Sequence, residues 1–109
     1  MDTGAHLPLR PVEFQVLASL ATSPHHGYAI LQEIEAREGA RAVPGLATLY
    51  RAIARLEKEG LIARVAEDLP SSEDDRRRIY RLTALGLEVV TAEALRLGPL
   101  VEMVKEARS

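Results

Sequence analysis

The sequence of 109 residues contains neither cysteine nor tryptophan, and only 4% of its residues are aromatic. The absence of cysteine excludes disulfide bonds, thiolate catalysis and cysteine-ligated zinc. The apolar runs are too short to span a bilayer, and the first residues lack the charged and apolar regions of a secretory signal. Because 47% of the residues are still hydrophobic, we expect one cytoplasmic domain with a core of Leu, Ile, Val and Ala.

A strong charge of one sign is also absent, since the net charge is −2 at pH 7. This value argues against a protein that binds polyanions over its whole surface. The charges are unevenly distributed, however, because residues 41–81 carry nine basic and seven acidic side chains, whereas the segments before and after are net acidic. Five of those seven acids lie between Glu67 and Asp75, in a predicted polar loop. An acidic protein can therefore still present one basic face to DNA.

Three helices are predicted in the first part of the chain. The first lies within residues 9–24, with Pro11 in its first turn, where the missing N–H costs nothing. The second is expected over residues 26–39, and the third between Gly45 and Gly60. Apolar residues at helical spacing predict one buried face of the third helix, formed by Leu49, Ala52, Ile53 and Leu56.

Two strands and a last helix follow. The strands are expected over residues 61–68 and 76–83, around a loop rich in Ser, Pro and Asp, so that they form an open hairpin. Thr83 is a suitable N-cap for the last helix. Gly98 and Pro99 are expected to kink or interrupt that helix, because proline lacks the N–H that the helix needs.

The order of helix, helix, helix, hairpin and helix is that of a winged helix-turn-helix protein. In this plan the third helix enters the major groove of DNA and the hairpin reaches along the backbone. The predicted fold class is therefore mainly α with a small β-hairpin. Arg51, Arg55 and Lys58 share one face of the third helix, turned away from its apolar face. Thr48 and Tyr50 lie near its start, where a recognition helix first meets bases and phosphates.

Charged residues on the outside of an amphipathic helix are ordinarily just hydrated, and the third helix alone favours that interpretation. The second predicted strand changes the balance because it is dense in arginine. Four arginines fall within six residues, at Arg76, Arg77, Arg78 and Arg81. Two basic elements in the places that a winged helix uses on DNA predict nucleic-acid binding.

Three ordered motifs also carry a resemblance to a known family: "FQVLASLATSPHHGYAILQEIEAREG", "TLYRAIARLEKEGLI" and "RRRIYRLTALG". Over about residues 7–97 the sequence resembles the PadR-type transcriptional regulators, of the short subfamily with a single C-terminal helix. The resemblance implies a sequence-specific DNA-binding protein, most often a repressor, that acts as a homodimer on a palindromic operator. Members of that family sense phenolic or drug-like compounds, but the four aromatic residues here name neither an effector nor its pocket.

The "HGY" at the start of the second helix leaves two interpretations open. Tyr28 is expected to pack against the third helix, with Gly27 allowing a close backbone approach. The resemblance instead places His26 and Tyr28 near a DNA phosphate, where free N–H groups at a helix start favour anions. His25 and His26 are adjacent and make a poor chelate. We therefore predict no metal site and no cofactor.

The last helix is more apolar than a helix outside a three-helix core needs to be. It could fold back onto its own domain, whereas the resemblance implies a two-fold dimer that uses this helix. On that interpretation residues 1–82 form the DNA-binding domain, and residues 83–109 form a dimerisation helix packed on the same domain. The interface residues predicted from this helix are Leu85, Val89, Ala92, Leu95 and Val101.

Taken together, these patterns predict a cytoplasmic homodimer that binds double-stranded DNA and regulates transcription, most often as a repressor. The competing hypothesis is a winged-helix module that uses the same surface for a protein partner, and the acidic net charge is its best support. An enzyme is not expected, because the sequence shows no pair of catalytic carboxylates, no Ser/His/Asp set and no glycine-rich phosphate loop.

Overall fold

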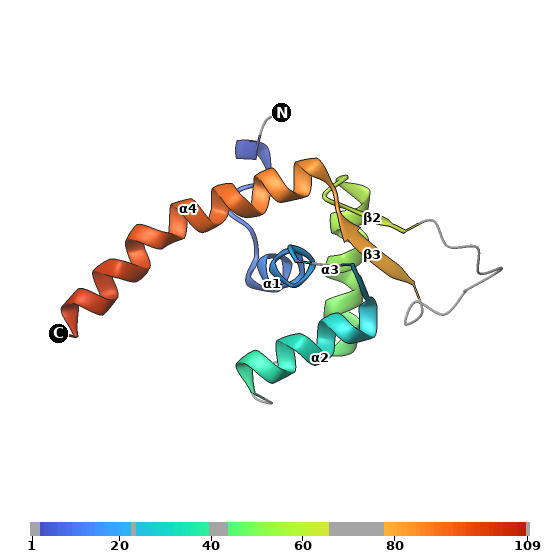
Figure 1. Cartoon of the computed structure of the whole chain (residues 1–109), viewed down its shortest axis with the longest axis horizontal. Coiled ribbons are helices and arrows are strands. Elements are labelled where there is room, and N and C mark those ends of the chain that lie inside the picture. Colours follow the sequence, from blue (N-terminus) through green and yellow to red (C-terminus); the bar gives the residue numbers. More distant parts are fainter. Residues whose placement is uncertain (1–2, 23, 40–43, 66–77, 109) are drawn as a thin grey trace.

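The computed structural model describes residues 3–22, 24–39, 44–65 and 78–108. Within these ranges the mainly helical architecture with a small β-hairpin is confirmed (Figure 1). The elements in chain order are a 3-10 helix η1 (Thr3–His6), α1 (Pro11–Leu20), β1 (His25–His26), α2 (Gly27–Glu38), α3 (Leu46–Lys58), β2 (Ile62–Arg64), β3 (Ile79–Leu82) and α4 (Ala84–Ala107).

Local sequence explains where several of these elements begin and end. Pro11 is the first residue of α1, where it costs no hydrogen bond. Gly60 follows α3 with φ +79°, a conformation that L side chains rarely adopt, and this turns the chain into β2. The hydroxyl oxygen of Thr83 accepts the backbone N–H of Gly86 at 2.9 Å and caps α4 as predicted. The same hydroxyl donates to the carbonyl of Gly60 at 2.6 Å, which ties α4 to the end of α3.

The sheet has three strands in the order β1–β3–β2, and both pairs are antiparallel. Ile62 pairs with Leu82 and Arg64 pairs with Tyr80, which is the predicted hairpin partnership. The third strand, β1, was not predicted. Its two residues pair with Tyr80 and Ile79, so the start of α2 is fixed against the far edge of β3.

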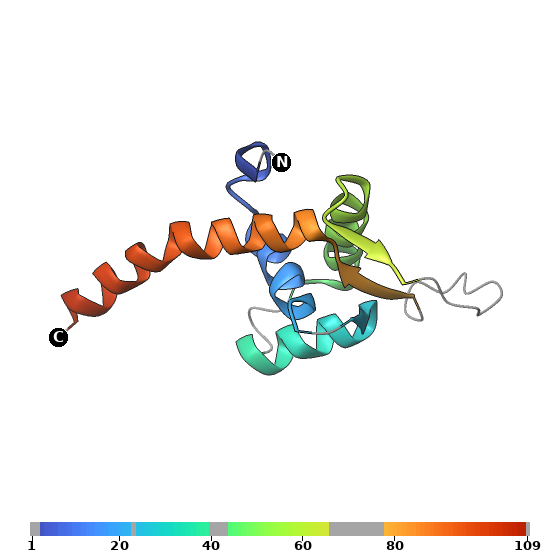
Figure 2. The same ribbon diagram turned by 45° about the horizontal axis from the view of Figure 1, so that its top comes forward.

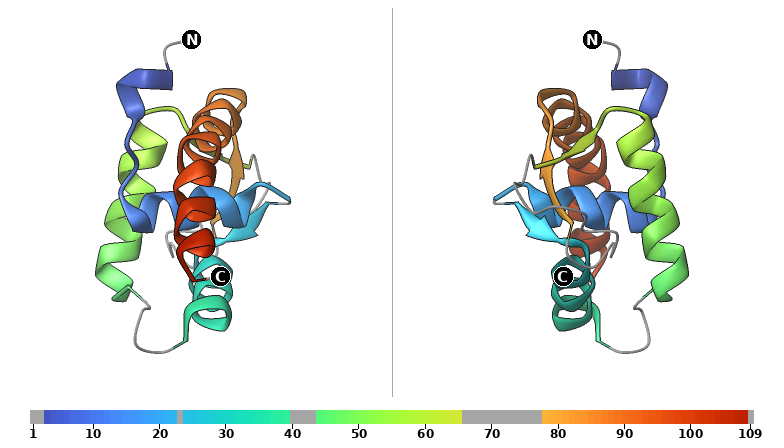
Figure 3. Two further views of the ribbon diagram at one scale, coloured as in Figure 1. Left: turned by 90° about the vertical axis from the view of Figure 1, so that its left-hand side faces the viewer. Right: turned by 90° about the vertical axis from the view of Figure 1, so that its right-hand side faces the viewer.

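The core lies where α1 meets the other three helices and the sheet (Figure 3). The α3 residues predicted to be buried are buried, and they pack with side chains from every other main element. These include Val16, Leu17 and Leu20 of α1, Ile30 and Ile34 of α2, Tyr80 of β3, and Val89 and Val90 of α4. Burial of this apolar surface is the main term that holds the fold together.

The expected interruption at Gly98 and Pro99 is wrong, because α4 is one continuous helix across both residues, and the alternative of a kink there stays a prediction. Proline removes a single N–H, and here the position that would have accepted it, Leu95, lies on the exposed part of the helix. Gly98 has no Cβ to crowd the proline ring that follows it, which removes the clash that usually ends a helix there. The helix therefore runs on past the core and projects away from the domain (Figures 1 and 2).

A buried carboxylate fastens the N-terminal segment to α4. Glu93 is only 1% exposed, and its Oε2 accepts the backbone N–H of Leu9 at 2.7 Å. Its other oxygen, Oε1, accepts a hydrogen bond from Nε of Arg96. The Arg96 hydrogen bond, with help from the Leu9 N–H, holds the pKa of Glu93 below its usual range, although desolvation by burial acts in the opposite direction.

This shift predicts a specific acid sensitivity. The pKa of Glu93 is lower in the folded chain, so its stabilisation is complete above its ordinary pKa of 4.5 and is lost as pH falls through the folded value. We expect the melting temperature of wild type to fall more steeply between about pH 6 and about pH 3 than that of Glu93→Gln, which keeps an acceptor for Leu9 but does not titrate. Thermal unfolding followed by circular dichroism measures both curves. Parallel curves would contradict the role given to Glu93.

Candidate nucleic-acid interface

The α3 helix has one buried face and one outward face. Figure 3 shows α3 along one side of the domain, with its outer side clear of the other elements. Thr48, Arg51 and Lys58 are exposed, as are Ala47 and Ala54. Arg51 and Lys58 are seven residues apart and therefore lie two turns apart on the same face. We call Thr48, Arg51 and Lys58 the α3 outer face.

Tyr50 lies between the two faces of α3. It is partly buried and packs against the hydrophobic core, so only part of its ring faces solvent. Within the α3 outer face, Nη2 of Arg51 donates to the hydroxyl of Thr48 at 3.4 Å. This contact lies along one turn of the helix and holds the Arg51 side chain near the helix start.

Arg55 behaves differently from its neighbours. Its Nη1 lies 3.1 Å from Oε2 of Glu13, a residue at the start of α1. Glu13 is buried, whereas the side chain of Arg55 is 41% exposed. The sequence grouped Arg55 with Arg51 and Lys58, but the structure turns its guanidinium toward α1. The sequence could not predict this ion pair, because Glu13 and Arg55 are 42 positions apart.

The structure describes only two of the four arginines predicted for the hairpin. Arg76 and Arg77 fall outside them, as does the acidic segment from Glu67 to Asp75. Arg78 is partly buried and Arg81 is exposed. Nε of Arg64 on β2 pairs with Oε2 of Glu57 on α3 at 2.8 Å, which joins the hairpin to the recognition helix.

Tyr80 anchors the hairpin beneath these charges. It is only 2% exposed and belongs to the core. Burial raises the pKa of Tyr80 and the nearby Glu57 carboxylate raises it further, while a hydrogen bond with Arg78 acts to lower it. The phenol therefore stays neutral at physiological pH. It fixes β3 while Arg81, the next residue, stays exposed.

The start of α2 reaches the same region through the sheet. The backbone N–H of Gly27 donates to the carbonyl of Arg78 at 3.3 Å, so the helix start and the hairpin are adjacent. Tyr28 is 44% exposed. Part of its side chain is therefore available at the surface, and its packing against α3 stays a prediction. The backbone of His26 pairs with Ile79, and its side chain lies outside the described part of the structure.

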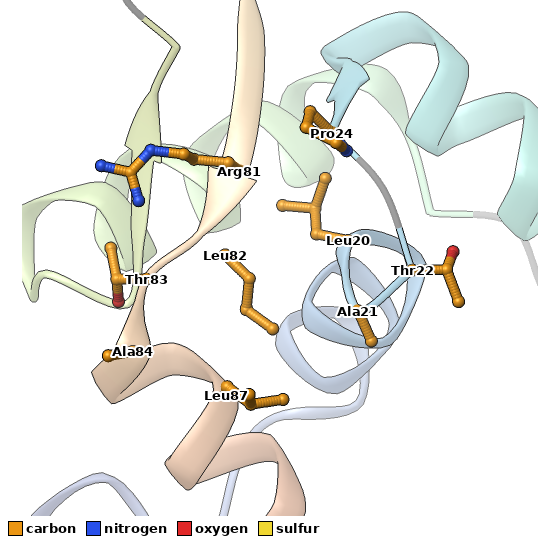
Figure 4. Close-up of a pocket in the computed structure, with 9 residues that line it drawn as sticks. All are labelled: Leu20, Ala21, Thr22, Pro24, Arg81, Leu82, Thr83, Ala84 and Leu87. Carbon is orange, nitrogen blue, oxygen red and sulfur yellow. The ribbon is translucent and has the colours of Figure 1, made fainter.

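Two surface hollows flank α1. One of about 350 Å³ separates the start of α1 from α3, and Arg10, Glu13, Thr48, Arg51 and Arg55 are among the residues that line it. The other, of about 340 Å³, lies between the end of α1 and the start of α4. In Figure 4 the aliphatic side chains of Leu20, Leu82 and Leu87 gather in this second hollow, and the Arg81 guanidinium stands at one side. The first hollow, with three arginines, continues the basic surface of α3.

Two further kinds of feature concern metal-binding clusters and membrane-spanning helices in the described residues. In the ranges that the structure covers, no group of three or more His, Asp or Glu side chains is arranged to hold a metal ion. No helix in these ranges combines the length and the apolarity that crossing a membrane requires.

A three-helix core, an outward third helix and an antiparallel hairpin beside it define a winged helix-turn-helix protein. The chain belongs to the transcriptional regulator PadR-like family, whose sequence profile matches residues 16–92. This confirms the family resemblance drawn from the three sequence motifs.

Solved structures of similar proteins agree with this assignment. A transcriptional regulator from Clostridium thermocellum is 26% identical, with 87% of each chain covered and a TM-score of 0.70. A PadR family transcriptional regulator from Eggerthella lenta is also 26% identical, with 98% of this chain and 85% of that chain covered and a TM-score of 0.67. A PadR family regulator from Clostridium difficile has a TM-score of 0.73 at 20% identity, covering 90% and 98% of the two chains, and shares the fold.

One curated relative has a higher identity. An uncharacterized 37.1 kDa protein in a transposon of Streptomyces fradiae is 40% identical over 92 residues, which are 84% of this chain. The match spans only 24% of that protein, so this chain corresponds to about a quarter of its length.

Proposed function

We propose that this chain is a cytoplasmic, sequence-specific DNA-binding repressor that acts as a homodimer on a palindromic operator. Membership of a family of transcriptional regulators supports DNA binding. The observation that carries the proposal for this chain is the α3 outer face, where two cations and a hydroxyl project from the helix opposite its buried side. A protein of net charge −2 that presents exposed cations on the outer face of its third helix can still offer a local surface to DNA.

In this proposal α3 lies in the major groove. Arg51 reads a base edge, because a guanidinium can bond two acceptors of guanine. Lys58 and Thr48 contact the backbone and fix the register of the helix, whereas the Tyr50 hydroxyl, predicted to take part, is buried. At the edges of the groove, further phosphate contacts come from side chains of the α2 start and the hairpin, namely His26, Tyr28, Arg76, Arg77 and Arg78.

The base-reading role of Arg51 has a direct test. We expect Arg51→Ala to weaken binding to the operator by about 1–3 kcal/mol more than binding to random DNA, because a bidentate base contact discriminates between sequences. Fluorescence anisotropy with labelled duplexes measures both affinities. Arg108→Ala is the control, since that arginine is exposed at the end of α4, far along the chain from α3. Equal losses on both duplexes would reduce Arg51 to a phosphate contact, and no loss on either would favour the protein-partner hypothesis.

The homodimer rests on the part of α4 that projects beyond the core. Val90 is buried against the domain, and Leu97, Leu100, Val101 and Val104 continue the same side of the helix. Of these, Leu100 and Val101 are each 49% exposed and Val104 is 65% exposed. An apolar helix face that continues past its own core fits a second copy of the same helix.

Some of the predicted interface residues lie in the first turns of α4, which pack on the core, and the others lie in the section that projects beyond it. Val89 is completely buried in its own core, so a partner has no access to it, and its assignment to the interface is corrected. Leu85 and Ala92 are partly buried. Leu95 is 72% exposed and Val101 is half-exposed. We therefore centre the proposed interface on Val101 and its neighbours in the last turns of α4.

A further inference from the structure

Glu13 occupies an unusual place for a carboxylate beside a DNA-binding helix. It lies in the first turn of α1 and is 6% exposed. Its two oxygens have separate partners. Oε1 accepts the backbone N–H of Arg10 at 3.1 Å, and Oε2 faces Nη1 of Arg55 at 3.1 Å. The carboxylate therefore caps α1 with one oxygen and holds a recognition-helix arginine with the other.

This arrangement makes Arg55 costly to move. A buried carboxylate that loses its cationic partner keeps its charge in a poorly hydrated place, which is strongly unfavourable. A DNA phosphate that drew the Arg55 guanidinium away from Glu13 would leave the carboxylate buried and unpaired. Moving the Arg55 guanidinium to a phosphate would replace one ion pair by another and add this penalty, so the net gain in binding free energy would be small.

Arg51, one turn earlier, is the natural comparison. It is exposed, and the contact that positions it is with the neutral hydroxyl of Thr48. Its charge is therefore free of the constraint that Glu13 places on Arg55. Both side chains line the hollow between α1 and α3, so they face the same space with different charge environments.

We propose that Glu13 is a positioning residue that withholds Arg55 from the DNA backbone. With Arg55 neutralised, phosphate contacts from α3 come from fewer cations, and binding to random DNA is weaker than the arginine content of the helix indicates. Base contacts by Arg51 are unaffected, so the loss falls on the sequence-independent part of the affinity. This inference rests on the proposed DNA-binding function and adds a residue outside the α3 outer face to it.

Four variants separate withholding from direct contact, and the readout is the salt dependence of binding to random duplex DNA. Each phosphate contact contributes about 0.9 to the slope of log K against log salt, or about 3.5-fold in affinity between about 50 mM and about 200 mM salt. Arg51→Gln and Arg55→Gln are a matched pair on one helix, and Gln at position 55 can still donate to Glu13. Glu13→Gln keeps an acceptor for the Arg10 N–H but carries no charge to hold Arg55. Glu13→Gln with Arg55→Gln removes the released arginine.

We expect Arg55→Gln to leave the slope unchanged, whereas Glu13→Gln steepens it by about 1.8, because the freed guanidinium of each of the two copies reaches phosphate. The double variant returns to the wild-type slope, and Arg51→Gln flattens it if Arg51 also bears on phosphate in random DNA. Thermal unfolding checks that each variant is folded, and the Arg55→Gln result stands by itself if Glu13→Gln fails to fold. Flattening by Arg55→Gln of about 1.8 would overturn the inference, as would an unchanged slope in folded Glu13→Gln. Failure of wild type to bind any duplex would instead overturn the proposed function.

Discussion

Replacing Val101 or Val104 by aspartate is expected to yield a folded monomer that binds a palindromic operator about 10²- to 10⁴-fold more weakly than wild type. Both side chains are at least half-exposed within their own chain, so the substitution costs the isolated domain little. In the proposed dimer the same aspartate would be buried without a partner, which is strongly unfavourable. A monomer presents one recognition helix instead of two and loses the gain from linked half-sites.

Sedimentation equilibrium measures the mass, and the same samples are titrated against operator DNA. Wild type is expected at twice the chain mass of 12.0 kDa and the aspartate variants at 12.0 kDa. Glu102→Ala is the matched control, because Glu102 is exposed and lies between the two valines in sequence but on another side of α4. Val89→Asp is not equivalent, since Val89 is fully buried and its replacement would unfold the domain. A wild-type chain that stays at 12.0 kDa at every concentration would refute the dimer.

Replacing Gly86 by alanine is expected to destabilise the fold by about 3 kcal/mol, at the upper end for overpacking a core. The added Cβ would lie 1.9 Å from the carbonyl oxygen of Leu61 and 2.9 Å from Cδ1 of Leu82. The Leu61 carbonyl cannot easily move, because it accepts the N–H of Thr83 at 3.1 Å and its residue is buried. Since Thr83 also caps α4, any shift would disturb the start of that helix.

Thermal unfolding tests this prediction, and the loss corresponds to a fall in melting temperature of roughly 15 °C for a domain of this size. Gly45→Ala is the control, because a Cβ at Gly45 meets nothing within 4 Å and its φ is negative. That control should cost less than about 1 kcal/mol, the loss of a weak N-cap. Equal small effects of the two variants would mean that α4 can move away from Leu61 without penalty.

Features with local causes could be predicted from the sequence. The buried face of α3 followed from apolar spacing within one helix, and Thr83 and Gly60 followed from the cap preferences of single residues. The pairing of β2 with β3 followed from two apolar segments around a polar loop. In each case the information lies within a few neighbouring residues.

Features that depend on residues distant in the sequence could not be predicted. The two residues of β1 form a strand only because β3 lies beside them, and nothing in "HH" indicates a strand. Pro99 was expected to kink or interrupt α4, yet the helix continues through it, because its exposed surroundings tolerate the lost donor. Val89 belongs to an apolar stripe that either its own chain or a second copy could have buried. In the structure its own chain buries it completely, so it belongs to the core.

The residues of the candidate DNA-binding site show the same difference between local and distant causes. The exposure of Thr48, Arg51 and Lys58 was predictable, because these positions are opposite the buried face of the same helix. The pairing of Arg55 with Glu13 was not, since helix periodicity says nothing about which side chain of α1 lies opposite. Spacing along one element therefore predicts which side chains face outward, and contacts between elements decide which of them are free to act.

If this chain binds duplex DNA through its basic surface as a dimer, its affinity for DNA must fall steeply with salt. The most direct test is a titration of wild type with labelled DNA from upstream of its own gene, at about 50 mM and about 200 mM salt. If Lys58, Arg76, Arg77 and Arg78 of each of two copies contact phosphate, the eight contacts predict a slope of about −7.2 and a loss of affinity of about 2 × 10⁴-fold between the two conditions. Absence of a complex at the lower salt concentration, or a complex whose affinity does not change with salt, would contradict the account.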